Sequence, residues 1–146
     1  MKHLSMLIVV ALTSACASRP TPIGYLSTPN RAADAVMVDD AVSELWPHCT
    51  KEDYGPIQLD IRLSGEFYEW LKAGLVQRGC NVLSVPPPNP AGTTVLSFVV
   101  DSVDDSLERR LTLVARSKTM SRLYSKADGQ WLGIGAWSVG TSAQKR

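Results

Sequence analysis

Two stretches of the chain carry apolar residues at the spacing of an amphipathic helix. The first begins near Asn30, which together with Thr28 is a candidate cap, and is expected to end at Pro47, because proline lacks the N–H that a helix interior needs. Its apolar face holds Val38, Val42, Leu45 and Trp46. The second begins after Ser64, a candidate cap, and is expected to end at Gly79, because glycine adopts the left-handed closing conformation at low cost. Its apolar face holds Phe67, Trp70, Leu71 and Leu75.

The other regular segments follow the two-residue period of β-strands. Residues 56–61 alternate apolar and polar positions, which predicts a half-buried strand, and residues 80–85 predict a second strand. The C-terminal third predicts an antiparallel meander, with strands at 95–100, from 107 onward, at 119–125 and at 131–139. Asp128-Gly129, between the last two strands, is typical of a tight hairpin turn. This order indicates an α+β fold in which two helices pack on one face of a mixed, largely antiparallel sheet.

The first fifteen residues have the pattern of an export signal. Lys2 supplies a positive head, residues 4–12 are apolar, and small residues stand immediately before Cys16. The apolar run is about half the length of a membrane-spanning helix, so we expect it to be removed as a signal peptide over residues 1–15. Small residues before a cysteine are typical of the bacterial lipobox, which predicts covalent lipid on Cys16. The alternative is an ordinary secretory signal that contains a cysteine.

The segment that follows Cys16 is rich in proline and hydroxyl side chains. This composition predicts a lipidated, flexible tether over residues 16–30 and a single periplasmic domain over residues 31–146. Two or three acyl chains would hold such a protein stably at a membrane. Ala17, at a position where aspartate favours retention in the inner membrane, favours the outer membrane, with the domain facing the periplasm.

Charge and cysteine content narrow the classes of function. The chain has 15 Lys and Arg residues against 14 Asp and Glu residues, and removal of Lys2 with the signal peptide leaves the two in balance. A neutral domain gives no basic surface for direct binding of nucleic acid. Cys49 and Cys80 each lie just past a predicted helix end. In an oxidising compartment they are a candidate disulfide, the alternative being two buried free thiols.

The sequence offers little chemistry for catalysis. His48 is the only histidine after the signal peptide, and it lies at a helix end, where a capping or surface role is more usual. His48 with Cys49 lacks nearby further ligands for a metal site. The carboxylates of residues 101–108 lack the glycine and the ligand spacing of a calcium loop. We therefore expect no enzymatic activity, no metal, no cofactor apart from the covalent lipid, and no small-molecule substrate.

Aromatic residues near the C-terminus are candidates for binding a partner. Trp131 and Trp137 are six residues apart, so both point to the same face of a regular strand, and Arg122 and Tyr124 lie on the preceding strand. These four residues either form a partner-docking patch, since interfaces favour Trp, Tyr and Arg, or pack beneath the helices. Arg109 interrupts an otherwise apolar strand face and is expected at its rim.

Five segments occur in order along the chain: the lipobox, Gln77-Arg78-Gly79-Cys80-Asn81-Val82, Leu111-Thr112-Leu113-Val114, Leu123-Tyr124 and Gly135-Ala136-Trp137-Ser138-Val139. Taken together, they resemble the TrbH family of conjugal transfer lipoproteins. The resemblance carries over one position, the lipidated cysteine, and no catalytic residue. It implies an accessory envelope component of a type IV secretion apparatus that transfers DNA, docked to mating-channel or other envelope proteins. The alternatives are a pilotin-like or other envelope-assembly lipoprotein, and a hydrolase or small-ligand binder.

Overall fold

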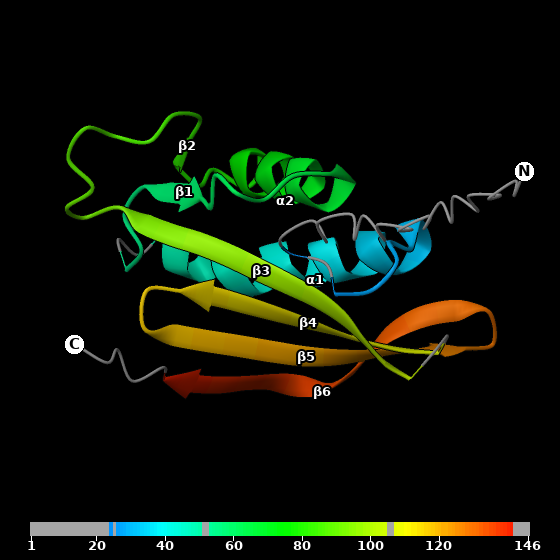
Figure 1. Ribbon diagram of the computed structural model, residues 1–146. Coiled ribbons are helices and arrows are strands. Elements are labelled where there is room, and N and C mark those ends of the chain that lie inside the picture. The colour runs from blue at the N-terminus through cyan, green and yellow to red at the C-terminus, as the bar shows by residue number, and fades with distance from the viewer. Residues whose placement is uncertain (1–23, 25, 51–52, 105–106, 142–146) are drawn as a thin grey trace, which may run out of the picture.

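The computed structural model describes residue 24 and residues 26–50, 53–104 and 107–141 of the chain. These residues form two helices and six strands, which Figure 1 shows in sequence colours. In chain order they are α1 (Arg31–Thr50), β1 (Ile57–Leu59), α2 (Glu66–Gln77), β2 (Val82–Leu83), β3 (Thr94–Asp104), β4 (Glu108–Ala115), β5 (Lys118–Ala127) and β6 (Gln130–Thr141).

The strands form one mixed sheet in the order β2-β1-β3-β4-β5-β6. Strand β1 runs parallel to both of its neighbours, whereas β3 to β6 form an antiparallel meander of long strands (Figure 1). The predicted α+β class is therefore confirmed, as is the hairpin turn at Asp128-Gly129, where both residues have positive φ. The two edges of the sheet differ, because β2 has two residues and β6 has twelve.

The core lies between the two helices and one face of the sheet. Its largest ring contact joins Phe67 of α2 to Phe98 of β3, with centroids 4.5 Å apart. The helices approach closely because α2 has a glycine at position 74, where an added Cβ would lie 2.7 Å from Val42 of α1. Other fully buried core residues include Met37, Leu45, Leu71, Leu75, Leu96, Leu111 and Leu113.

The opposite face of the sheet is not covered by either helix. Its apolar side chains are substantially exposed, and we call this surface the open face; it includes Val95, Leu123, Leu132 and Ile134. On β5 and β6 the side chains alternate between the core face and the open face, so Trp131 is 5% exposed and its neighbour Leu132 is 53% exposed.

Helix α1 is longer than predicted. Asn30 caps it, because Asn30 Oδ1 accepts a hydrogen bond from the Ala33 N–H at 3.1 Å, but the helix passes through Pro47 and ends at Thr50. Proline removes one hydrogen bond of the last turn and leaves the residues after it free to continue. The bond from Cys49 to Cys80 then holds that turn against the chain that follows α2. Trp46, predicted on the apolar face, is 40% exposed.

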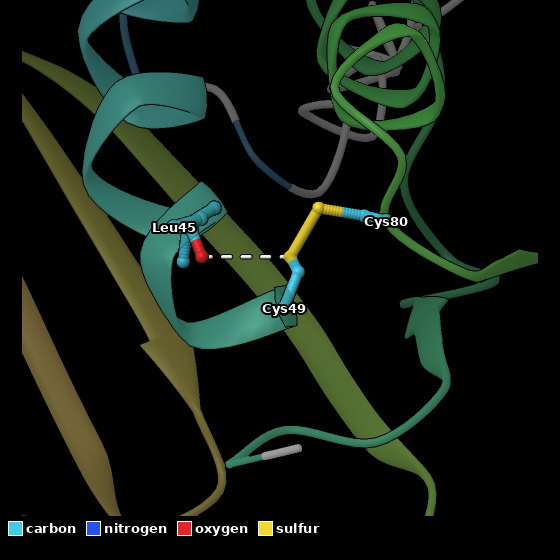
Figure 2. Close-up of a disulfide and its surroundings, with 3 residues drawn as sticks. All are labelled: Leu45, Cys49 and Cys80. Atoms are coloured by element: carbon cyan, nitrogen blue, oxygen red, sulfur yellow. Dashed lines mark hydrogen bonds between the residues drawn. A yellow bond between two sulfur atoms is a disulfide. The ribbon is translucent and has the colours of Figure 1, made fainter. Parts of the chain in front are cut away.

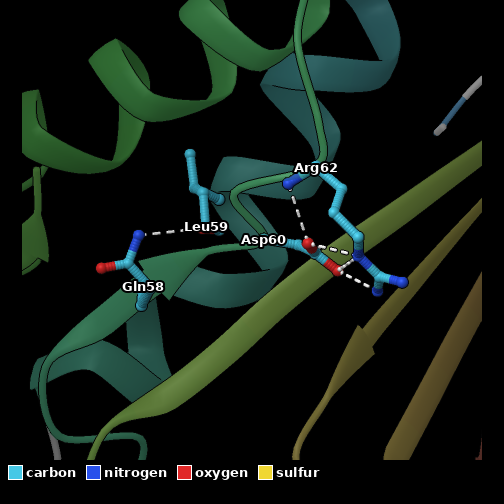
Figure 3. Close-up of polar contacts among 4 residues, drawn as sticks. All are labelled: Gln58, Leu59, Asp60 and Arg62. Carbon is cyan, nitrogen blue, oxygen red and sulfur yellow. Dashed lines mark hydrogen bonds and ion pairs between the residues drawn. The ribbon is translucent and has the colours of Figure 1, made fainter. Parts of the chain in front are cut away.

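Strand β1 is shorter and more buried than the predicted half-buried strand over 56–61. All three of its residues are buried, and so is Asp60, because β1 lies inside the sheet between two parallel neighbours. Figure 3 shows what ends it: Asp60 accepts hydrogen bonds from the N–H and the Nε of Arg62 at 3.0 and 2.9 Å. This turn directs Ile61 outward, where it is 72% exposed.

Helix α2 begins without the cap predicted at Ser64. The N-cap residue is Gly65, and no side chain forms a capping hydrogen bond. Two glutamates in the first turn favour the positive end of the helix dipole instead. The predicted end is confirmed: Gly79 has φ 87°, and the N–H groups of Gly79 and Cys80 donate to carbonyls of Val76 and Leu75.

Candidate functional site

The predicted lipidation site and most of the predicted tether lie outside the described residues. Cys16 lies outside them, and the first described residue is Gly24. From that point the backbone is fixed against β3. The Val100 N–H donates to the Gly24 carbonyl at 2.7 Å, and the Leu26 N–H donates to the Val100 carbonyl at 2.9 Å. The backbone at Gly24 and Leu26 is therefore paired with β3, at the C-terminal end of the segment predicted as a tether.

Gly24 occupies a position that no larger residue fits. It is buried with φ 106°, and an added Cβ would lie 2.9 Å from both Leu63 Cδ2 and Phe98 Cε2. Further along, Ser27 Oγ accepts a 3.4 Å hydrogen bond from Arg109 Nη1. The backbone at Gly24 thus has a defined position beside the Phe98 ring of β3.

A disulfide joins the two helices. Cys49 in the last turn of α1 is bonded to Cys80, which follows α2, with the Cα atoms 5.2 Å apart (Figure 2). Cys49 Sγ also lies 3.4 Å from the Leu45 carbonyl oxygen, a van der Waals contact because a bonded sulfur has no proton to donate. The crosslink closes a loop of 31 residues, which in the chain-entropy model stabilises a fold by roughly 3 kcal/mol.

The four residues predicted as an aromatic docking patch do not form an exposed surface. Tyr124 is fully buried, Trp131 is 5% exposed, and Trp137 is half-buried and packs against the core. They lie on the face of β5 and β6 that α1 covers, so the packing interpretation describes them. Arg109 lies at the rim, as predicted, with its guanidinium 5.9 Å from the centre of the Trp131 ring.

Arg122, the fourth residue of that set, forms an ion pair between the sheet and α1. Its Nη1 lies 2.9 Å from Asp40 Oδ2, and both side chains are less than one-third exposed. Burial, and then the charge of Asp40, raise the pKa of the Tyr124 phenol well above its ordinary value, so this hydroxyl stays protonated. The two-residue period of β5 predicts on which face Arg122 lies, but nothing in the sequence pairs it with Asp40 of α1.

His48 and Asp101 have ordinary surface contacts. His48 Nδ1 lies 3.3 Å from Asp53 Oδ2, and its ring packs 5.0 Å from that of Tyr54. Asp101 pairs with Arg110 across β3 and β4, which raises the pKa of that guanidinium. Within the described part of the chain, no three His, Cys, Asp or Glu side chains are grouped to hold a metal ion.

A surface groove between α1 and α2 was not predicted from the sequence. Its volume is about 770 Å³, and both Trp70 and Arg78 line it. Arg31 lies 5.6 Å from the Trp70 ring, and Arg78 lies 5.8 Å from the Trp46 ring. The small residues along the groove are Ala35, Ser43 and Ala73. Those small residues are visible in the sequence, but their alignment depends on how the helices cross.

Comparison of the sequence with known families gives one match. The sequence model of the conjugal transfer protein TrbH matches residues 19–142. Neither the curated proteins nor the solved structures include a match to the chain. Of the two helices that the structure describes, neither is long and apolar enough to cross a membrane.

Proposed function

Because the chain belongs to the TrbH family of conjugal transfer proteins, we propose that it is a lipid-anchored structural component of the type IV secretion apparatus that moves DNA between cells. The family match carries this proposal, since residues 19–142 include every residue that the structure describes. The protein acts by docking to mating-channel or other envelope proteins, without a catalytic step.

The anchor in this proposal is lipid on Cys16, after cleavage of residues 1–15. The fixed position of Gly24 makes the tether short, because eight residue steps separate it from Cys16. A fully extended chain spans at most about 3.6 Å per residue, so the domain stays within roughly 30 Å of the bilayer. We place it at the periplasmic face of the outer membrane, where confinement raises its effective concentration for docking.

Two surfaces are available for contacts with channel proteins. One is the groove between α1 and α2, which Trp70 and Arg78 line, and Trp and Arg are residues that interfaces favour. The other is the open face, which presents apolar side chains on several strands. Aromatic, arginine and aliphatic side chains line these two surfaces, and such side chains suit docking to another protein, which supports a structural role.

The test is a Cys16→Ser variant of the full chain in a donor cell. We expect loss of lipid labelling, release of the protein from the membrane fraction, and a fall in transfer frequency. Ser18→Ala is the matched control, because it lies two residues after Cys16 and leaves both the lipobox and the disulfide unchanged. Wild-type transfer frequency with a stably produced, unlipidated Cys16→Ser chain would show that anchoring is not part of the mechanism.

In-cell crosslinking tests the partners separately from the anchor. A tagged chain crosslinked during active transfer should recover mating-channel proteins. Recovery of none of them, in cells that are transferring DNA, would favour the alternative role in assembling another envelope structure.

A further inference from the structure

Strand β6 is an edge strand without the usual protection. It is the outermost strand of the sheet on its side, and none of its twelve residues is Asp, Glu, Lys, Arg or Pro. Exposed edges present unpaired N–H and C=O groups, and proteins commonly blunt them with charges, prolines or very short strands. The opposite edge follows that rule, because β2 has only two residues.

Apolar side chains are concentrated at the same edge, on the open face. Leu132 and Ile134 of β6 are 53% and 47% exposed, and Leu123 beside them on β5 is 39% exposed. An uncharged edge therefore adjoins an apolar surface strip. Strand addition uses both features, since main-chain hydrogen bonds give affinity and alternate side chains give specificity.

The hairpin geometry shows which backbone groups of β6 point outward. Asp128 and Gly129 have φ values of 50° and 80°, which is a type I′ turn, and Ala127 pairs with Gln130 beside it. In an antiparallel ladder, hydrogen-bonded and non-hydrogen-bonded pairs alternate. Residues 130, 132 and 134 thus bond inward to β5, so the N–H and C=O groups of Trp131 and Gly133 point away from the sheet.

An irregularity limits how far a new strand can extend. The pairing of β5 with β6 shifts between Ser121 and Leu123, and Gly135 within the shifted part of β6 has φ 67°. Regular edge geometry is therefore confined to residues 130–134 on the turn side. The centre of that segment is Leu132.

We propose that a second copy of this chain adds to this edge, with the two β6 strands antiparallel about Leu132. In this register Trp131 of each copy exchanges hydrogen bonds with Gly133 of the other. The absence of charge on β6 favours a copy as the occupant, because a strand that faces itself places like charges together unless it has none.

The same register makes a specific prediction on the open face. The two Leu132 side chains face each other in a non-hydrogen-bonded pair, where Cα atoms are about 4.5 Å apart. Gln130 of one copy faces Ile134 of the other. The interface is short, so we expect a concentration-dependent dimer rather than an obligate one.

Cysteine crosslinking of the full chain in its own envelope tests this register. Leu132→Cys should form a disulfide-linked homodimer on a non-reducing gel. Ile134→Cys alone should remain monomeric, whereas coexpressed Gln130→Cys and Ile134→Cys chains should crosslink. Leu123→Cys, exposed on the same face but one strand inside the edge, is the control and should remain monomeric. The assay reports self-pairing whether or not Cys16 carries lipid, so its result is separate from that of the anchoring test.

Sedimentation of the detergent-solubilised chain gives a second measurement. Leu132→Lys places like charges opposite each other and should lower self-association at least tenfold, while Leu123→Lys should not. Both residues are exposed, so the melting temperature should hold in each variant. A wild-type chain that is monomeric at every concentration, with no Leu132→Cys homodimer, overturns the proposal. A Leu132→Cys crosslink only to a protein of another size also overturns it, because the edge then belongs to a different partner.

Discussion

Arg122 reaches Asp40 by passing over a residue that has no side chain. The ion pair, 2.9 Å from Nη1 to Oδ2, joins β5 to α1 across the width of one strand. That strand is β6, and the residue beneath the guanidinium is Gly133, where an added Cβ would lie 2.6, 2.7 and 2.8 Å from Nε, Cζ and Nη2 of Arg122. Any side chain at position 133 would therefore force the guanidinium to shift.

Gly133→Ala should displace the guanidinium and break the ion pair with Asp40. We expect the free energy of unfolding to fall by about 1–2 kcal/mol, the range for charge-assisted hydrogen bonds that are partly screened. Urea denaturation measures it. In an Arg122→Met background the same Gly133→Ala change should be neutral or stabilising, because alanine reduces the backbone entropy lost on folding. A loss of equal size in both backgrounds would mean that the methyl group clashes with something other than Arg122.

The disulfide should contribute more stability than any single polar contact. Cys49→Ala with Cys80→Ala should lower the free energy of unfolding by about 3 kcal/mol, which for a domain of this size lowers the melting temperature by roughly 10 °C. Calorimetry with and without reductant measures it. Reductant should reproduce the loss in the wild-type chain and should not change the double variant. A wild-type melting temperature that reductant leaves unchanged would contradict a stabilising crosslink.

The element types could be predicted from the sequence because they follow from local periodicity. The strong alternation of β4 and the Asp128-Gly129 turn predict the meander, and Gly79 predicts the end of α2. Features that depend on contacts between segments far apart in the sequence could not be predicted in this way. The length of β1 depends on its burial between two parallel strands, and the extent of α1 past Pro47 accompanies the disulfide to Cys80.

The docking residues show the same limit. A two-residue period places Tyr124, Trp131 and Trp137 on one face, but it does not say whether that face is covered. The structure places α1 over it, so these residues belong to the core or pack against it. The absence of charge on β6 can be read from the sequence, but its position at the sheet edge and the groove between the helices depend on how the elements pack.

Substitutions at two neighbouring positions of β6 should differ in their effect on stability, because one side chain lies on the core face and the other on the open face. Trp131→Ala should destabilise the fold by about 3–5 kcal/mol, because it leaves a cavity beneath α1. Leu132→Ala, at the next position but more than half exposed, should change the free energy of unfolding by about 0.5 kcal/mol or less. Thermal unfolding of the two variants gives the comparison. Similar losses at both positions would mean that the open face is covered as well.

Asp60 should make the stability of the fold depend on pH in the acid range. Hydrogen bonds from the Arg62 side chain lower the pKa of this carboxyl below its ordinary value of 3.8, against the opposing effect of burial. A carboxyl with a lowered folded-state pKa stabilises the fold above its unfolded pKa, and this contribution is lost as pH falls through the folded value.

Asp60→Asn keeps the shape and removes the charge, so it should destabilise the protein at pH 7. Below about pH 4 the gap between wild type and variant should narrow, and denaturation at a series of pH values measures it. The stability gap between wild type and Arg62→Gln should also narrow as pH falls, because this variant removes the hydrogen-bond partner of Asp60. A gap that stays constant from pH 7 to pH 2.5 would mean that the ionised form of Asp60 has no advantage in the fold.

Gly24 should be the point at which the tether ends and the domain begins. Gly24→Ala adds a Cβ 2.9 Å from Leu63 and Phe98 at φ 106°, so it combines backbone strain with a steric clash. Gly92→Ala is the matched control, because Gly92 has φ 83° and open space around it and therefore isolates the strain. We expect both variants to lose about 1 kcal/mol to strain and Gly24→Ala to lose a further 1–3 kcal/mol to overpacking, measured by thermal unfolding. Equal losses would show that residues before Asn30 are not held against β3, which would restore the longer tether that the sequence predicts.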